Sequence, residues 1–311
     1  MSLENKQIVD IIFPATACDI SEVKKIKNFL KNNNFDFNIF LEKELVLKNK
    51  PTHEFPSSDA SLRFKQLKQA IENPNSKIIW CARGGYGSAE LLPFLQKLKK
   101  PKNKKIFIGF SDISSLNNFL IQEWNWQVIT APMLAQIILE KVSKKSAKAT
   151  INLLNQKKGS DPFFKLEQLS THINNLSAQI VGGCLSVLSG TFATKNQLNW
   201  ENKILFLEDE GEDGERLDRY FLQLITIMIE QKKYPKAILL GNFLQANPHG
   251  SPKAKNIKIA IKRFVENLKK NNLKIPTFEE KTKCLGHSKN MMPLILGADA
   301  TINGGFLIQK I

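Results

Sequence analysis

A serine occupies the point where a predicted strand passes directly into a predicted helix. In KIFIGFSDISSLNNFL, a buried strand ends at Phe110 and a helix follows over residues 112–123, which leaves Ser111 on the turn. A hydroxyl on such a turn is held exposed, and the N–H groups of the first helical turn point toward a bound group. This favours Ser111 as a nucleophile and the N–H of Asp112 as an oxyanion donor. Serine is also a common N-cap, so a purely structural role stays open at this point.

A glycine-rich turn follows another predicted strand, over residues 77–82, in the segment WCARGGYGSAELLP. Gly84 and Gly85 let the backbone approach a ligand closely and adopt positive φ. The turn could cradle a phosphate, but it lacks the GK[ST] ending of a nucleotide P-loop. It could equally supply a second oxyanion donor or bind a carboxylate, for which Arg83 offers a positive charge. We therefore expect Arg83 and Gly84 to contact substrate.

An acidic loop and a histidine loop could complete a catalytic group. ILFLEDEGEDGERLDR places Glu208 at the end of a predicted strand. Its clustered carboxylates could bind a metal, although EF-hand spacing is absent and no histidine is close. One of them could instead orient a histidine, as in Ser-His-acid triads. Among the four histidines, His287 follows Gly286 in a loop from which a general base can reach a site, and His249 is its rival.

Strands and helices must alternate to position these residues. In the first half, apolar runs predict strands at 7–13, 35–41, 77–82, 105–110 and 126–130, and helical spacing predicts helices at 20–32, 62–72, 88–98 and 112–123. Such alternation predicts an α/β fold with a mostly parallel sheet covered on both faces.

A polar segment without clear periodicity, residues 156–176, predicts a linker between two domains. We expect a nucleophile domain over residues 1–155 and a C-terminal domain over residues 177–311 that carries the acid and the base. Strand candidates in the second half are 178–181, 203–207, 237–240 and 305–309, and helix candidates are 220–231 and 255–268. The 311 residues suit two lobes of ordinary size.

Composition excludes several classes of protein. Apolar residues make up 42% of the chain and charged residues 24%, which is enough apolar material for a core and argues against disorder. No stretch approaches the roughly 18 apolar residues of a membrane-spanning helix. The first residues, MSLENKQIVDIIFPA, lack the features of a secretory signal, so we expect a cytoplasmic protein without a membrane partner.

The formal net charge of +16 invites a nucleic-acid interpretation. Two features argue against it. Lysine is dispersed along the whole chain, and arginine, the better reader of bases and phosphates, occurs only five times. The densest basic run, KLKKPKNKK at 97–105, bridges a helix and a strand and is most simply a solvated connection. We therefore expect no specific nucleic-acid partner.

The cysteines predict neither a zinc site nor a disulfide framework. They are far apart and form no CxxC pair: Cys18, Cys81, Cys184 and Cys284. We expect them to be buried free thiols, and we expect no metal or other cofactor.

Taken together and in this order, the segments resemble the LD-carboxypeptidases, serine peptidases that include the microcin immunity enzymes. The matching motifs are RGGYG at 83–87, GFSD at 109–112, GGxLS at 182–186, LFLED with a following DR at 205–209 and 218–219, and GH at 286–287. The resemblance spans nearly the whole chain. It implies a parallel-sheet nucleophile domain and a second, mixed α/β domain, with the site between them.

The resemblance also implies roles for individual residues. Ser111 matches the family nucleophile, Glu208 the triad acid and His287 the base. The N–H groups of Asp112 and Gly85 would form the oxyanion hole. Family members are commonly homodimers, and they cleave the bond between the L-centre of a diamino acid and a terminal D-alanine in cell-wall tetrapeptides during murein recycling.

Three departures from the family pattern leave the triad positions untouched. Cys184 stands in GGCL where the family usually has GGNL, PATA replaces PSS near the start, and TAPM at 130–133 replaces HGPM. We expect these changes to bear on substrate fit rather than on reaction class.

Other functions stay open beside this one. A related peptidase could act on a peptidyl-adenylate toxin. An ordinary esterase ranks lower because the turn is not GxSxG. A non-catalytic module that binds cell-wall fragments or nucleic acid would keep its function after the substitution Ser111→Ala.

Overall fold

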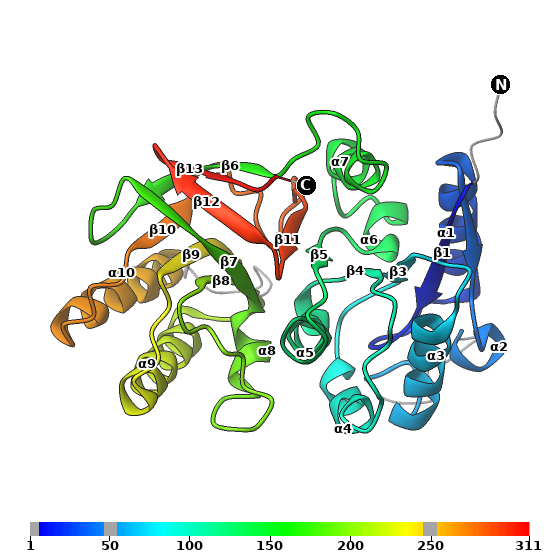
Figure 1. Cartoon of the computed structure of the whole chain (residues 1–311), viewed down its shortest axis with the longest axis horizontal. Coiled ribbons are helices and arrows are strands. Elements are labelled where there is room, and N and C mark those ends of the chain that lie inside the picture. The colour runs from blue at the N-terminus through cyan, green and yellow to red at the C-terminus, as the bar shows by residue number, and fades with distance from the viewer. Residues whose placement is uncertain (1–5, 47–54, 245–253, 311) are drawn as a thin grey trace.

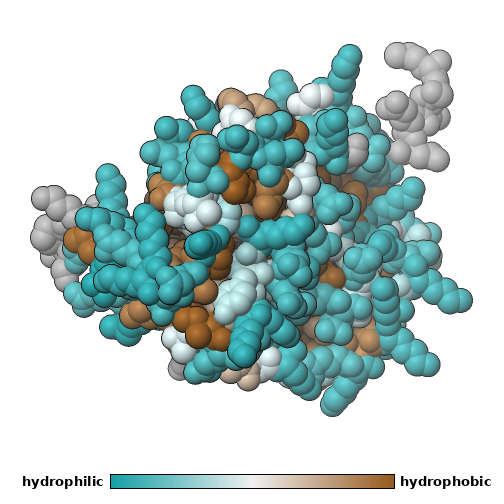
Figure 2. All heavy atoms as spheres, turned by 60° about the vertical axis from the view of Figure 1, so that its left-hand side comes forward, coloured by the Kyte–Doolittle hydropathy of each residue, from teal (hydrophilic) through white to brown (hydrophobic). Residues whose placement is uncertain are grey.

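The computed structural model describes residues 6–46, 55–244 and 254–310, which form two lobes lying side by side (Figure 1). On the face in Figure 2, polar side chains predominate and separate the apolar patches from one another. Within the described ranges, no helix has both the length and the apolar character needed to cross a membrane. All four cysteines are buried and free, which confirms the prediction made for them.

The first lobe is built on a six-stranded sheet in the order β11-β5-β4-β3-β1-β2. All neighbours pair in parallel except β11 and β5, which are antiparallel. The strands are β1 (Gln7–Ile12), β2 (Phe35–Asn38), β3 (Ile78–Cys81), β4 (Ile106–Ile108), β5 (Val128–Thr130) and β11 (Leu294–Leu296). The central strands β3 and β4 consist of apolar residues, as in other parallel sheets covered on both faces.

Helices cover both faces of this sheet, and alternate strand residues point to opposite layers. Ile79 and Cys81 of β3 belong to one cluster, whereas Ile78 and Trp80 belong to the other. The first cluster includes residues of α3 (Ala60–Glu72), α4 (Leu92–Leu95) and α5 (Ser114–Trp124). The second includes residues of α1 (Ile20–Asn32), α2 (Glu42–Leu45), α6 (Leu134–Ile138) and α7 (Lys144–Leu154).

The second lobe is a closed barrel in the order β10-β6-β13-β12-β7-β8-β9. Its strands are β6 (Phe163–Gln168), β7 (Asn175–Cys184), β8 (Ile204–Glu210), β9 (Ala237–Leu244), β10 (Thr277–Glu280), β12 (Asp299–Asn303) and β13 (Phe306–Ile308). The run from β7 to β10 is parallel and the other pairs are antiparallel. Its helices are α8 (Leu185–Ser189), α9 (Gly214–Gln231) and α10 (Ala254–Lys270). The predicted fold class, a mostly parallel lobe plus a mixed α/β lobe, is confirmed.

The lobes do not divide cleanly at the expected linker. Residues 156–176 contain β6, whose side chains alternate between exposed and buried and which closes the barrel between β10 and β13. In the other direction, β11 comes from the last part of the chain and completes the sheet of the first lobe. The chain therefore passes between the lobes more than once.

Two glycines at the end of β7 allow close packing, Gly182 within the barrel and Gly183 between the two lobes. A Cβ on Gly182 would lie 1.9 Å from the carbonyl oxygen of Phe206 on β8, and a Cβ on Gly183 would lie 2.4 Å from Ser114 Oγ on α5. Directly after them, the N–H of Cys184 donates to Ser114 Oγ at 3.1 Å. This contact joins β7 of the barrel to the helix that follows Ser111.

Candidate active site

Ser111 lies on a sharp turn after β4 and is the first residue of the short 3₁₀ helix η2 (Ser111–Ile113), which leads into α5. Its φ of 63° is in the left-handed region, which is uncommon for a serine, while Phe110 before it is extended. The turn is packed tightly, since a Cβ on Gly109 would lie 2.6 Å from Ile113 Cγ2. The side chain of Asn117 also donates to the carbonyl of Gly109 at 2.9 Å. The turn thus presents Ser111 at the carboxyl end of a buried strand.

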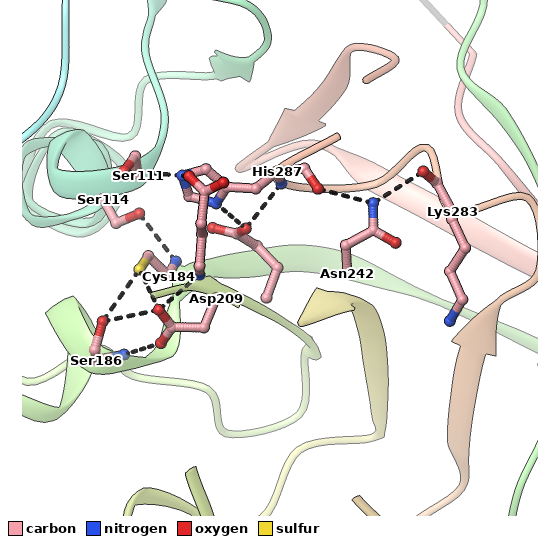
Figure 3. A network of polar contacts seen from close by, with 10 residues as sticks. Ser111, Ser114, Cys184, Ser186, Asp209, Asn242, Lys283 and His287 are labelled. Carbon is pink, nitrogen blue, oxygen red and sulfur yellow. Dashed lines mark hydrogen bonds and ion pairs between the residues drawn. The ribbon is translucent and has the colours of Figure 1, made fainter. Parts of the chain in front are cut away.

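The structure brings Ser111, His287 and Glu208 together, and Figure 3 shows Ser111 beside the ring of His287. His287 Nε2 is 3.1 Å from Ser111 Oγ, and His287 Nδ1 is 2.6 Å from Glu208 Oε2. The backbone N–H of His287 donates to the same carboxylate oxygen at 3.0 Å. Nδ1 therefore carries the proton that it donates to Glu208, and Nε2 is left to accept the proton of Ser111. This is the order of contacts in a Ser-His-acid triad.

The barrel positions the acid and the base. Glu208 lies near the end of β8 and pairs in register with Cys184 of β7. Gly286 has φ 84° and packs on Glu208, because a Cβ there would lie 2.7 Å from the Glu208 side chain. Asn242 of β9 donates to the carbonyls of Lys283 and His287, at 2.9 and 3.1 Å (Figure 3). The loop that carries His287 is therefore fixed by two strands, β8 through Glu208 and β9 through Asn242.

The charges around His287 raise the pKa of its imidazole. Burial by itself lowers the pKa of His287, but the Glu208 carboxylate, with smaller contributions from Glu210 and Asp209, raises that pKa above its ordinary value. The ring also packs against Phe110, with centroids 4.6 Å apart. Because the lone pair of Nε2 must be free to accept a proton from Ser111, protonation of the ring removes its ability to act as a base.

The predicted oxyanion donors belong to two turns near Ser111: Gly85 lines the same cavity as Ser111, and Asp112 follows it in the chain. Gly85 has φ 108° and packs against Thr16, since a Cβ there would be 2.1 Å from Thr16 Oγ1. Asp112 follows Ser111 directly, and its buried carboxylate accepts the N–H of Ser88 at 2.9 Å. Burial raises the pKa of this carboxyl group. The Asp112 side chain thus ties the serine turn to the glycine-rich turn, and the oxyanion role of the two N–H groups stays a prediction.

A cavity of about 550 Å³ opens in front of Ser111 and His287. Its charged lining residues come from both lobes: Arg83, Lys141, Glu210 and Lys289. The Arg83 guanidinium donates to the carbonyl of Ala17 at 2.9 Å and to Glu22 at 2.6 Å. Arg83 and Gly84 thus line the cavity beside Ser111. The ion pair with Glu22 offsets much of the positive charge of Arg83.

Sequence reasoning missed three of these charged groups. Lys141 lies in a loop between two helices of the first lobe, where no motif marks it. Glu210 and Lys289 each lie two residues beyond a predicted triad member, and that spacing is the one signal that could have drawn attention to them. The N–H of Ser143 donates to the carbonyl of Lys289 at 2.6 Å, so the two lysine-bearing loops are joined across the lobes.

Cys184, the departure from the family's amide, lies in a buried polar network beside Glu208. Its Sγ is 3.4 Å from Asp209 Oδ1, and Asp209 also accepts the N–H and the hydroxyl of Ser186, at 2.6 and 3.0 Å (Figure 3). Burial, with the Glu208 charge, raises the pKa of Asp209 to about 6. Burial also raises the pKa of the Cys184 thiol well above its ordinary value. Cys184 does not line the cavity, whereas Thr16 of the PATA segment does.

The acidic loop after Glu208 has partners within the protein. Asp213 caps α9 by accepting the N–H of Arg216 at 2.8 Å, and the Arg216 side chain pairs with Glu212 at 3.2 Å. Across the residues that the structure describes, no group of three or more His, Cys, Asp or Glu side chains could hold a metal ion. His249, the rival base, lies outside the described residues.

Comparison with known proteins gives consistent matches along the chain. Residues 9–131 match the model of the LD-carboxypeptidase N-terminal domain, and residues 177–302 match that of the C-terminal domain. A Rickettsia conorii protein assigned as a carboxypeptidase is 31% identical over 97% of this chain and 89% of its own length. The murein tetrapeptide carboxypeptidase of Pseudomonas aeruginosa is 26% identical over 76% of each chain.

Solved structures share the fold over nearly the whole length. An MccF-like protein from Bacillus anthracis superposes with a TM-score of 0.77 at 21% identity, covering 99% of this chain and 98% of its own. A muramoyltetrapeptide carboxypeptidase from Oxalobacter formigenes superposes with a TM-score of 0.75 at 22% identity, covering 97% and 99%. At these identities the likeness establishes the architecture alone.

Proposed function

This chain belongs to the LD-carboxypeptidase family of serine peptidases, and from that premise we propose that it releases terminal D-alanine from cell-wall tetrapeptides. The bond cleaved would join the L-centre of a diamino acid to the D-residue. The observation that carries the proposal is the contact series Ser111–His287–Glu208, whose first two members line one cavity. A relative from Pseudomonas aeruginosa that is named a murein tetrapeptide carboxypeptidase supports this choice of substrate.

The proposed reaction begins with attack by Ser111. Its Oγ forms a bond to the carbonyl carbon while its proton passes to His287 Nε2, and Glu208 stabilises the imidazolium through Nδ1. The N–H groups of Asp112 and Gly85 would receive the developing oxyanion. His287 then returns the proton to the leaving nitrogen, the C–N bond breaks, and the electron pair of that bond goes to the nitrogen, which departs as a neutral amine. Water activated by His287 hydrolyses the acyl-enzyme in the reverse sequence.

The cavity fits a small peptide. Its volume of about 550 Å³ lies within the range of sites that bury small ligands. Cations from both lobes, Lys141 and Lys289, suit a substrate with several carboxylates. Arg83 and Gly84 would contact the peptide on the opposite, glycine-rich side.

Defined tetrapeptides carrying either lysine or diaminopimelate at the third position test this function. We expect the enzyme to release D-alanine, measured by mass spectrometry, and the substitution Ser111→Ala to lower kcat by roughly 10³-fold or more with folding unchanged. A peptidyl-adenylate serves as the competing substrate. Faster cleavage of the adenylate than of both tetrapeptides would assign the protein to toxin immunity, and near-wild-type turnover by Ser111→Ala would reject a serine mechanism.

We also propose that the enzyme works as a cytoplasmic homodimer that needs no metal or other cofactor and has no specific nucleic-acid partner. Light scattering measures the mass in solution, and a monomeric mass would reject the dimer. Dialysis against EDTA should leave the activity unchanged, and a loss that zinc or magnesium restores would contradict the metal-free reaction.

A further inference from the structure

A second carboxylate lies beside the proposed base, and the reaction above does not use it. Glu210 is the last residue of β8, and its Oε2 is 3.4 Å from His287 Nε2. This is the nitrogen that faces Ser111 Oγ at 3.1 Å, whereas Glu208 contacts the opposite nitrogen, Nδ1. The imidazole therefore has a carboxylate on each side, and only the one at Nε2 is on the side of the reacting bond.

Glu210 differs from Glu208 in its access to the cavity. The side chain of Glu210 is 53% exposed, whereas that of Glu208 is 2% exposed. Glu210 is also the one carboxylate among the described residues that line the cavity. The cations there are Lys141, Lys289 and the Glu22-paired Arg83. A bound substrate can therefore meet a single, localised negative charge, and that charge is next to Nε2.

The distance to Nε2 places Glu210 near the leaving group. A leaving nitrogen must come within about 3 Å of Nε2 to receive its proton. Since Oε2 of Glu210 is 3.4 Å from the same atom, the leaving nitrogen and this oxygen can be no more than about 6 Å apart. A half-exposed side chain can shorten that separation by rotating.

We propose that Glu210 is a catalytic residue of the acylation step, which stabilises the positive charge that forms on the leaving nitrogen. This inference rests on the proposed function. The amide nitrogen is neutral in the bound peptide. It becomes cationic when it receives the proton from His287 Nε2, and it leaves as a neutral amine when the C–N bond breaks and the electron pair returns to it. A carboxylate beside that nitrogen interacts more strongly with the cationic intermediate than with the bound amide, which is the condition for acceleration.

The effect should be moderate because water screens a half-exposed carboxylate. We expect the substitution Glu210→Gln to lower kcat/KM for an amide by about 3- to 10-fold. An ester in the same position has an oxygen in place of the nitrogen, and that oxygen departs as an alcohol without passing through a comparable cation. The substitution Glu210→Gln should therefore lower kcat/KM for the ester much less than for the amide.

The test compares a tetrapeptide ending in D-alanine with the depsipeptide ending in D-lactate. Both keep the same acyl part and the same terminal carboxylate, so repulsion between Glu210 and that carboxylate affects them equally. Rates are measured at a pH above the acid limb, where His287 is neutral in every variant. Glu215→Gln is the matched control, because Glu215 is exposed in the first turn of α9 and does not line the cavity.

We expect the amide-to-ester ratio of kcat/KM to fall by about threefold or more in Glu210→Gln and to stay unchanged in Glu215→Gln. An equal loss on both substrates, or no loss on either, would overturn the inference while the proposed function stands. A wild-type enzyme that releases no D-alanine from the tetrapeptide would instead refute the proposed function, and the inference with it.

Discussion

Ser111 holds its hydroxyl against His287 with a backbone conformation that few serines adopt. A φ of 63° costs roughly 1–2 kcal/mol for a residue with a Cβ, so surrounding contacts must impose it. The close packing of Gly109 against Ile113 and the bond from Asn117 to Gly109 do so. Strain of this kind is typical of a nucleophile elbow, where the turn is sharp because the side chain must be presented at the end of a strand.

The direction of the His287 pKa shift predicts the pH dependence of the reaction. The base works only when neutral, so activity is lost as the pH falls through its pKa in the folded enzyme. That pKa is raised above its ordinary value of 6.5, because the neighbouring carboxylates outweigh the effect of burial. The midpoint of the acid limb of kcat/KM should therefore lie above pH 6.5. Glu208→Gln removes the largest cause that raises the pKa, so it should move the limb to lower pH and also slow the reaction.

Two histidine variants provide the control for this assignment. His287→Ala should cost about as much activity as Ser111→Ala, because triad members act as a unit. His249→Ala should cost little. An inactive His249→Ala enzyme together with an active His287→Ala enzyme would reject His287 as the base.

The neighbouring barrel strands β7 and β8 join Glu208 to the helix that follows Ser111. β7 and β8 pair in register from Ile180 and Ile204 to Cys184 and Glu208. At Gly182 the backbones of β7 and β8 approach closely. Gly182 has φ 136°, and a Cβ on it would overlap the carbonyl of Phe206. A small residue at this point is therefore a condition for Glu208 to lie opposite Cys184, whose N–H bonds Ser114.

Gly182→Ala should lower the free energy of unfolding by about 3 kcal/mol or more, because a Cβ there would overlap backbone atoms that cannot rotate away. Gly159→Ala is the matched control. Gly159 also has positive φ, at 78°, but a Cβ on it would meet nothing within 4 Å. Gly159→Ala should lower the free energy of unfolding by only about 1 kcal/mol, because alanine is strained at positive φ. Thermal unfolding followed by circular dichroism compares the two, and equal losses would show that β7 can move to accept the Cβ.

The two lobes share secondary structure as well as a site. β11 follows His287 in the chain and yet forms an edge of the sheet in the first lobe, beside β5 (Figure 1). Leu294 and Leu296 are buried in the cluster that also contains Trp126 and Val128 of the first lobe and Phe206 of the barrel. One continuous apolar cluster therefore extends through both lobes.

A shared core of this kind predicts a single cooperative unfolding transition. Far-ultraviolet circular dichroism and tryptophan fluorescence should report the same midpoint in a denaturant titration. Trp80, Trp124 and Trp126 lie in the first lobe and Trp200 in the second, so both lobes contribute to the fluorescence. A fragment of residues 1–155 lacks β11 and should not fold stably. Two separate transitions, or a stable fragment, would show that the lobes fold independently.

Most of the fold and the site could be predicted because the spacing of apolar residues along a segment reflects which of its faces are buried. Apolar runs marked β3 and β4, and mainly apolar runs marked β1 and β5, since a strand covered on both faces needs mostly apolar residues. β6 was missed because its polar residues face solvent and its alternation is short. β11 is only three residues long, too short for a periodic signal.

The sequence by itself determined the fold class, the position of Ser111 on its turn, and, through the resemblance, the three residues expected to act together. Those are properties of contiguous segments, where residue type and spacing decide the backbone. Only the tertiary structure decided that Arg83 is paired with Glu22, that Lys141 and Lys289 line the cavity, and that Glu210 lies at Nε2 of His287. These contacts join segments far apart in the chain or depend on side-chain direction, and both are set by the packing of the two lobes against each other.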